Sequence, residues 1–396
     1  MVFNWNTLDQ EMIKDINQKK ILQLLQKRRE MTKQEMSQIL GLSIPTISNN
    51  INELMKEGLV EEGGVADSTG GRKPVIIRFL PDARFSFGVD ISTQHVHIVL
   101  TNLDSQIRHQ VKFPFSRMET IEDIMKKIAE RIQEIIKEQQ IEGKKVVGIG
   151  FSLPGTVNEE IGNLEMAPNL GLYHISFKNR FSSFYSVPIY IENEANAAAL
   201  GELHLGVAKQ MQNLVYLSIK EGIGSGIVIQ GHLYKGKNKR AGEFGHMSII
   251  ANGKYCNCGR KGCWELYASV QSLLSLYKKT LLEDEPYITL DYFFHQLDEK
   301  EQEAQKIWNM YLEYLATGIQ DIILSLDPHY IVIGGDISLY GEHLLPSLKQ
   351  KVFVPNSFYE EEDNTLVVSA LQENASVLGA SLLPLHNLLF YNDSVL

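Results

Sequence analysis

The amino-acid sequence predicts an α/β protein with a small N-terminal head and a larger body made of two similar lobes. Capped helical segments and a glycine-rich basic segment occupy the first 82 residues. From Phe85 onward, apolar strand-like runs alternate with helical segments, as is typical of α/β domains. A paired-strand beginning occurs at Phe85 and again at Leu214, and this repetition predicts the two lobes.

Length, composition and charge agree with this division. The chain has 396 residues, 44% of them hydrophobic and 22% charged, which is usual for a globular protein of two or three domains. It has no apolar run of about 20 residues and no N-terminal apolar signal segment, so we expect a cytoplasmic protein without a membrane span. Net charge is −10, but residues 1–85 carry 12 basic and 11 acidic residues, so the acidity lies in the body and the head is compatible with DNA binding.

The head is predicted to begin with three helices. Apolar residues between positions 18 and 26 have helical spacing, and two shorter helices follow. A tight glycine turn between the two shorter helices is the helix-turn-helix arrangement. The residues expected to begin or end these two helices are Thr32 with Glu35 in a capping box, Gly41, Ser43 with Pro45 in the first turn, and Gly58.

The third helix and the segment after it have the features of a DNA-binding surface. Short polar side chains suited to phosphates and base edges are Thr46, Ser48, Asn49, Asn50 and Asn52. Strands over 59–62 and 75–79 flank a glycine-rich tip that carries Arg72 and Lys73, expected to contact phosphate or the minor groove. We therefore predict a winged helix-turn-helix over residues 1–82. A small helical docking domain is the alternative.

The body is predicted to contain two α/β lobes with a ligand cleft between them. Residues 83–192 form the smaller lobe, residues 193–375 form the larger one, and a C-terminal helix over 376–396 is expected to return to the smaller lobe. Strand hairpins repeated in two lobes are the plan of the actin/hexokinase superfamily. The expected strands are 85–91, 95–101, 145–152, 187–191, 214–219, 227–229 and 330–333, with a long helix over 121–140.

The only three cysteines of the sequence lie within eight residues of one another. Cys256, Cys258 and Cys263 follow His246, and one histidine with three cysteines can close a tetrahedral, structural Zn²⁺ site. Glycines between Cys258 and Cys263 let the chain fold tightly around an ion. Three buried free thiols are the alternative.

These motifs resemble the ROK family, which unites sugar repressors and sugar kinases. The matching segments are Ala167-Pro168-Asn169-Leu170, Glu192-Asn193-Glu194-Ala195-Asn196, the Gly222-Gly224-Gly226 turn, Gly242-Glu243-Phe244-Gly245-His246 and the cysteine motif. The head resembles the winged helix-turn-helix of MarR-like and ROK-type repressors, and the whole layout looks most like the xylose-operon repressors of the family.

The resemblance implies a sugar site in the cleft. The residues that match the family's sugar contacts are Asn193, Glu194, Glu243, His246 and Glu265, and Asn169 and Gly155 are expected to line the site. His246 is expected to bind zinc through one ring nitrogen and the sugar through the other.

The resemblance also bears on catalysis. Family kinases carry Asp-x-Gly-Gly-Thr at the first phosphate turn, where this chain has Asp90-Ile91-Ser92-Thr93-Gln94, and Glu221 stands beside the second turn. Glu194 matches the general-base position of the kinases, but we assign no catalytic residue and expect no enzyme activity. The alternative is an ATP-dependent, hexokinase-like sugar kinase with a DNA-binding head, and a third reading is a repressor that binds a phosphotransfer protein instead of a sugar.

The sequence thus predicts a sugar-responsive repressor that acts as a homodimer on double-stranded operator DNA. A monosaccharide inducer is expected to release it. Xylose is the first expectation, and glucose and N-acetyl sugars stay open.

Overall fold

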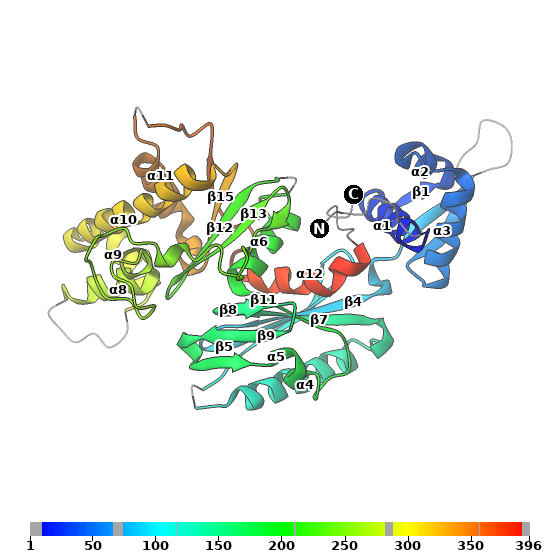
Figure 1. Ribbon diagram of the computed structural model, residues 1–396, viewed down its shortest axis with the longest axis horizontal. Helices are drawn as coiled ribbons and strands as arrows, with labels where there is room; N and C mark the ends of the chain where they lie inside the picture. The colour runs from blue at the N-terminus through cyan, green and yellow to red at the C-terminus, as the bar shows by residue number, and fades with distance from the viewer. Residues whose placement is uncertain are drawn as a thin grey trace.

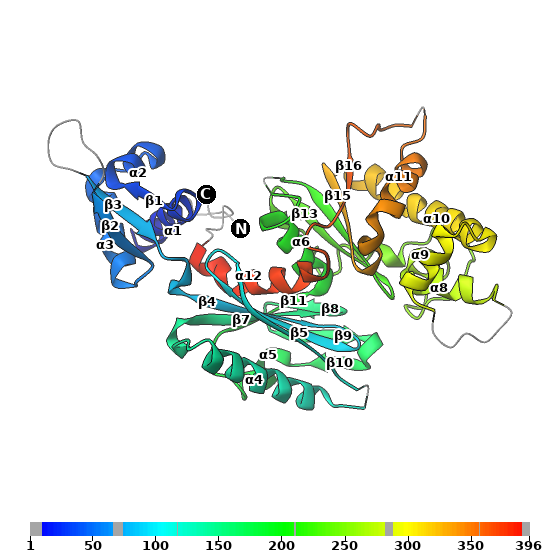
Figure 2. The same cartoon turned by 180° about the vertical axis from the view of Figure 1, so that it is seen from behind.

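The computed structural model describes residues 10–65, 74–116, 118–209, 211–281, 288–355 and 357–389. Figure 1 shows the head at one end of the molecule, the first lobe below the centre and the second lobe at the other end. Seen from behind in Figure 2, helix α12 (Ala375–Leu389) runs between the head and the second lobe, above the first sheet. Arg72 and Lys73, the predicted wing tip, lie outside the described residues.

The head is a three-helix unit with a three-stranded antiparallel sheet in the order β1-β3-β2. Its elements are α1 (Gln10–Arg28), β1 (Glu30–Thr32), α2 (Lys33–Leu40), α3 (Ile44–Lys56), β2 (Val60–Val65) and β3 (Val75–Phe79). The predicted capping box of Thr32 and Glu35 is present, Gly41 has a left-handed φ of 67°, and Ser43 caps α3. The winged helix-turn-helix prediction is confirmed.

The body contains two five-stranded sheets with the same topology. In each sheet, three successive strands form an antiparallel meander and two later strands add in parallel on the other side. The first sheet consists of β4 (Phe85–Ile91), β5 (His95–Asn102), β6 (Ile107–Pro114), β7 (Val146–Leu153) and β11 (Ile189–Asn193). The second consists of β12 (Leu214–Ile219), β13 (Ile223–Ile229), β14 (His232–Leu233), β15 (Tyr330–Gly334) and β16 (Thr365–Val368).

Alternate residues of each sheet face different layers, because successive strand side chains point to opposite faces. In the first sheet, Phe87 and Val89 pack in the core with α4 (Ile121–Glu138), while Gly88 lies against the backbone of α12. In the second sheet, Leu214 and Tyr216 pack against α6 (Glu194–His204), and Val215, Leu217 and Ile219 pack against the helices of the opposite face. The two-lobed α/β prediction is confirmed.

A helical layer covers the outer face of the second sheet (Figure 1). Its helices are α7 (Glu265–Ala268), α8 (Val270–Lys278), α9 (Leu290–Asp298), α10 (Gln302–Leu326) and α11 (Gly341–Val352). The first lobe adds a small sheet of β8 (Thr156–Asn158), β9 (Asn163–Ala167) and β10 (Leu172–Ile175), and the short α5 (Phe177–Phe181). None of the helices in the described part of the chain is long and apolar enough to cross a bilayer.

The head and the body share one apolar core. Leu385 and Leu389 of α12, with Leu103 after β5, belong to the same buried cluster as the head residues Ile21 and Ile77. Polar contacts flank this cluster: Gln26 Nε2 donates to the Leu103 carbonyl at 2.6 Å, and Arg29 pairs with Asp104. The head is therefore packed against the body.

Candidate functional site

A cavity of about 460 Å³ lies between the two lobes. It forms where the parallel strands of both sheets reach their carboxyl ends, the position at which open α/β sheets usually bind ligands. Residues at such strand ends include Asp90 of β4, Asn193 of β11 and Gly335 after β15. Of the seven predicted sugar residues, the structure brings six to the cavity wall: Gly155, Asn169, Asn193, Glu194, Glu243 and Glu265.

Asn193 is held at the cavity by its own local structure. Its Oδ1 caps α6 by accepting from the backbone N–H groups of Ala195 at 2.9 Å and Asn196 at 3.1 Å, while its Nδ2 donates to the Gly155 carbonyl at 2.7 Å. Gly155 has a φ of +81°, and a Cβ there would lie 2.0 Å from the Met166 carbonyl oxygen. Asn193 therefore ties a helix terminus of the second lobe to a turn of the first.

Glu194 is engaged by a lysine that the sequence reasoning missed. Lys220 Nζ donates to Glu194 Oε1 at 2.7 Å, and Ser218 Oγ donates to the same oxygen at 3.0 Å. Burial disfavours the charged form of Lys220, but the carboxylates of Glu194 and Asp90 outweigh it and hold the pKa above its usual value. The carboxylate at the kinase general-base position is thus held in an ion pair. In the sequence, Lys220 is marked as a possible site residue only by its position directly before Glu221 of the second phosphate turn.

The two phosphate turns of the kinase pattern contact one another through side chains. Thr93, in the β4–β5 turn, donates its hydroxyl to Glu221, in the β12–β13 turn, with both carboxylate oxygens 3.3 Å away. Burial, reinforced by Glu194 and Glu221, raises the pKa of the nearby Asp336 carboxyl. Carboxylates outnumber lysines on the cavity wall: they are Asp90, Glu194, Glu221, Glu243, Glu265, Asp336 and Glu373, against Lys112 and Lys220. This wall is a poor environment for a polyphosphate.

A second set of polar contacts joins the lobes at the side of the cavity. Lys235 of the second lobe pairs with Glu192 at 2.6 Å and with Glu159 at 2.8 Å. Lys239 pairs with Glu159 at 3.0 Å and with Glu160 at 2.8 Å. Together with Thr93 and Glu221, these ion pairs fix the relative position of the lobes in this state.

The His246 and cysteine side chains converge as predicted. The four ligand atoms lie within 4.8 Å of one another, with Cys258 Sγ 3.6 Å from Cys263 Sγ and His246 Nδ1 3.6 Å from Cys256 Sγ. Tetrahedral Zn²⁺ with ordinary bond lengths separates such atoms by about 3.6–3.8 Å, so the donor set and spacing fit this ion. Gly262 has a φ of +77°, and a Cβ there would lie 1.8 Å from the Ile250 carbonyl oxygen, so the tight turn requires glycine.

His246 connects this cluster with the cavity. Its Nδ1 faces the cysteines and also lies 3.2 Å from Glu265 Oε1, while its Nε2 lies 3.9 Å from Glu243. The buried Trp264 anchors the same motif, because its Nε1 donates to the Tyr314 carbonyl of α10 at 2.8 Å. His246 itself does not line the cavity, but its two carboxylate neighbours do.

The predicted DNA-reading residues of α3 do not all share one surface. Asn49 and Asn52 are exposed, and Thr46 and Ser48 are half-buried. Asn50 is only 4% exposed, and its Nδ2 donates to the Thr46 carbonyl at 2.8 Å. The prediction that Asn50 contacts DNA is therefore wrong for this structure, because its position places it on the core side of the helix.

Comparisons with known proteins agree with these features. The ROK family model matches residues 86–386, and a winged helix-turn-helix DNA-binding model matches residues 14–61. The xylose repressor of Bacillus subtilis (strain 168) is 33% identical over 380 residues, covering 94% of this chain and 96% of that protein. The glucokinase of Thermotoga maritima is 29% identical over 308 residues, covering 74% and 95%.

A solved structure extends the likeness to the whole fold. The crystal structure of a ROK family transcriptional regulator, a homologue of the E. coli MLC protein, superposes with a TM-score of 0.81 at 25% identity, covering 95% of this chain and 98% of that one. The repressor and regulator matches include the head, whereas the glucokinase match spans about three quarters of the chain. This chain belongs to the ROK family and is one of its winged helix-turn-helix transcriptional regulators.

Proposed function

We propose that this protein is a cytoplasmic, sugar-responsive repressor that binds operator DNA as a homodimer and is released by a monosaccharide, with xylose as the first candidate. The observation that carries the proposal is the convergence of six predicted sugar residues on one interlobe cavity, in a chain that also has a DNA-binding head. The likeness to a xylose repressor over nearly the whole chain supports xylose.

The sugar is proposed to act by fixing one arrangement of the lobes. Gly155 and Asn169 belong to the first lobe and Glu243 and Glu265 to the second, so a ligand between them interacts with both. Helix α12 packs on the first sheet and on α6, and its last turns enter the core of the head. An effector shifts such an equilibrium only by its differential affinity for the two states. By linkage, operator DNA then weakens sugar binding by the same factor.

Two observations make phosphoryl transfer the less favoured alternative. Lys220 holds the Glu194 carboxylate that would act as general base. Glu221 and its acidic neighbours lie where the kinase pattern has phosphate-binding turns. Their carboxylates would repel the negatively charged phosphates of a bound nucleotide and weaken its binding.

We also propose that His246, Cys256, Cys258 and Cys263 hold a structural Zn²⁺ ion. Four protein ligands leave no open position, so the ion supplies folding energy and no chemistry. Since His246 contacts Glu265 and lies near Glu243, the ion also fixes the sugar-side carboxylates.

Operator release by sugar tests the function. Fragments from the promoter regions around the gene are titrated with the protein in gel shifts, alone and with xylose, glucose or N-acetylglucosamine. One sugar should weaken operator binding by roughly 5- to 150-fold, a typical range for allosteric coupling. Glu243→Ala should bind DNA normally and lose the response, while Glu130→Ala, an exposed position on helix α4, should keep it.

Two outcomes contradict the proposal. Operator affinity that is unchanged by every sugar that binds means that the cavity is not the switch. Phosphorylated sugar formed from ATP and Mg²⁺ well above background means that the kinase alternative is correct.

A further inference from the structure

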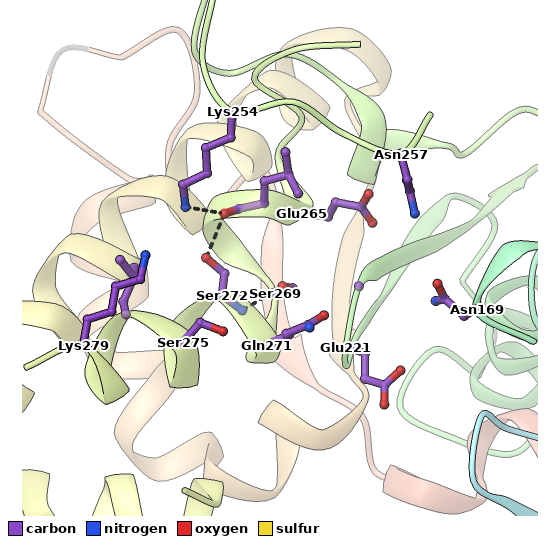
Figure 3. Close-up of a pocket in the computed structure, with 13 residues that line it drawn as sticks. Asn169, Glu221, Lys254, Asn257, Glu265, Ser269, Gln271, Ser272, Ser275 and Lys279 are labelled. Carbon is purple, nitrogen blue, oxygen red and sulfur yellow. Dashed lines mark hydrogen bonds between the residues drawn. The ribbon is translucent and has the colours of Figure 1, made fainter. Parts of the chain in front are cut away.

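A second cavity, of about 350 Å³, opens from the interlobe cavity along helix α8. The two cavities share the wall residues Asn169, Glu221, Gly222 and Glu265. Figure 3 shows Gln271, Ser272 and Ser275 along α8, with Glu265 above them and Asn169 on the side of the first lobe. Two predicted sugar residues, Asn169 and Glu265, thus border both spaces.

The chemistry of this second wall fits a neutral, polyhydroxylated ligand. Its charges balance, since Glu221 and Glu265 are matched by Lys254 and Lys279. Leu266 and Leu276 are the larger apolar side chains on the described wall, so little surface is offered to a hydrophobic ligand. Most of the remaining wall carries amide or hydroxyl groups, each able to donate and accept: Asn169, Asn257, Ser269, Gln271, Ser272 and Ser275.

Two of the polar side chains that α8 contributes to this wall, those of Gln271 and Ser275, are uncommitted. Ser269 Oγ accepts from the Ser272 backbone N–H at 3.1 Å, and Ser272 Oγ donates to the Leu266 carbonyl at 2.9 Å, so both serve the local fold. Gln271 and Ser275 are exposed and stand one helical turn apart on α8. Within the described part of the chain, neither side chain has a hydrogen-bond partner.

We propose that this second cavity, the α8 subsite, binds the second ring of an oligosaccharide whose terminal ring occupies the interlobe cavity. Each cavity alone has the size of a ligand pocket, roughly 300–1,000 Å³, so a monosaccharide in the first leaves the second free for a linked ring. Gln271 and Ser275 bind hydroxyls of that ring. The inference rests on the proposed sugar site and adds that the ligand has at least two linked sugar rings.

Calorimetry on the full-length protein tests the α8 subsite. Xylose with xylobiose, and glucose with cellobiose, are titrated into the wild type. At least one disaccharide should bind about tenfold more tightly than its own monosaccharide, since the gain from two added hydrogen bonds is partly offset by the ordering of the second ring. Gln271→Ala with Ser275→Ala should remove this advantage and leave the monosaccharide affinity within about twofold. The exposed-helix control Gln305→Ala should leave both affinities unchanged.

The results separate this inference from the proposed function. Monosaccharide binding without any gain for a disaccharide overturns the α8 subsite and leaves the sugar sensor intact. Absence of binding by any monosaccharide or disaccharide overturns both. A parallel titration with ATP adds a third criterion: if the double variant weakens ATP binding while leaving the disaccharide affinity unchanged, the cavity is a nucleotide site and the inference is wrong.

Discussion

At the scale of single residues, Asn193 shows how much of the site the sequence could predict. Its place in the Glu192–Asn196 motif predicted a pocket residue, and the structure places it on the cavity wall. The sequence did not predict that its amide also caps α6 and holds Gly155. Lys220 was missed for the same reason: partners far apart in the chain become visible only when the lobes are assembled.

This double use of Asn193 leads to a prediction. Asn193→Ala should lower the free energy of unfolding by about 1–2 kcal/mol through loss of the cap, and should also weaken sugar binding because the Gly155 turn is released. Asn193→Asp keeps the capping acceptors, so it should lose less stability but still weaken sugar binding. Urea unfolding and calorimetry measure the two effects. Thr120→Ala removes the cap of α4 away from the cavity; if it weakens sugar binding equally, the positioning role is wrong.

The proposed zinc ligands give a second residue-scale prediction. Protein purified without added metal should carry about one equivalent of zinc, and Cys258→Ser should lose it and destabilise the second lobe, since structural zinc supplies folding energy. Lys261→Ser, in the same loop, should keep the metal. Elemental analysis that finds less than about a tenth of an equivalent in the wild type would reject the site.

At the scale of elements, the strands with buried alternating or continuous apolar runs were predicted to within a few residues. The strand predicted over 85–91 matches β4, and the helix predicted over 121–140 matches α4 (Ile121–Glu138). Helices α8 to α11 were not predicted, although the buried residues of α10, from Ala304 to Ile323, recur at helical spacing, so their apolar pattern was present in the sequence. The small β8–β10 sheet was missed because its strands are only three to five residues long.

Helices α6 and α12 cross in close contact at Gly201 of α6 and Gly379 of α12, and this crossing is testable. A Cβ on Gly379 would lie 1.7 Å from the Ala197 carbonyl oxygen, so Gly379→Ala should force the helices apart and lower the free energy of unfolding by about 1–3 kcal/mol. This loss of stability should occur although alanine, compared with glycine, favours the helical conformation by about 1 kcal/mol. Gly143→Ala has open space around the new methyl group and serves as the control in urea unfolding. Equal stability of the two variants would contradict the close crossing.

The same pair of helices predicts a dependence on pH. Burial, reinforced by His386, lowers the pKa of His204 from 6.5 to about 4, and burial with Lys19 and His232 lowers that of His386. Below pH 6.5 the unfolded chain therefore binds more protons than the folded one, and stability falls as the pH falls from about 6.5 toward 4. Between pH 7 and pH 5 the free energy of unfolding should fall by about 1–2 kcal/mol from this cause. His204→Asn should reduce this fall, as measured by unfolding titrations at several pH values. The exposed His329→Asn should leave the profile unchanged.

At the scale of the whole molecule, the two lobes and the head form one connected structure. The cavity lies where both sheets end, α6 begins at Asn193 in its wall, and α12 joins the sheets to the head. The sequence predicted the parts and their order from local patterns. It could not predict that the head and α12 share a core, because Leu385 and Ile21 lie far apart in the chain.

This connection yields the last prediction, which separates signal transmission from DNA binding. Gln26→Ala with Arg29→Ala removes both polar contacts to the loop at Leu103 and Asp104 while leaving the shared apolar core intact. If the head must follow the body for release to occur, the double variant should bind operator within about threefold of the wild type but show a smaller sugar-induced change in affinity. Arg131→Ala, which breaks an exposed ion pair on α4 far from the joint, is the control. Fluorescence titration of labelled operator, with and without sugar, measures the coupling. An unchanged ratio of the two affinities in the double variant would mean that the apolar contact of α12 with the head transmits the signal alone.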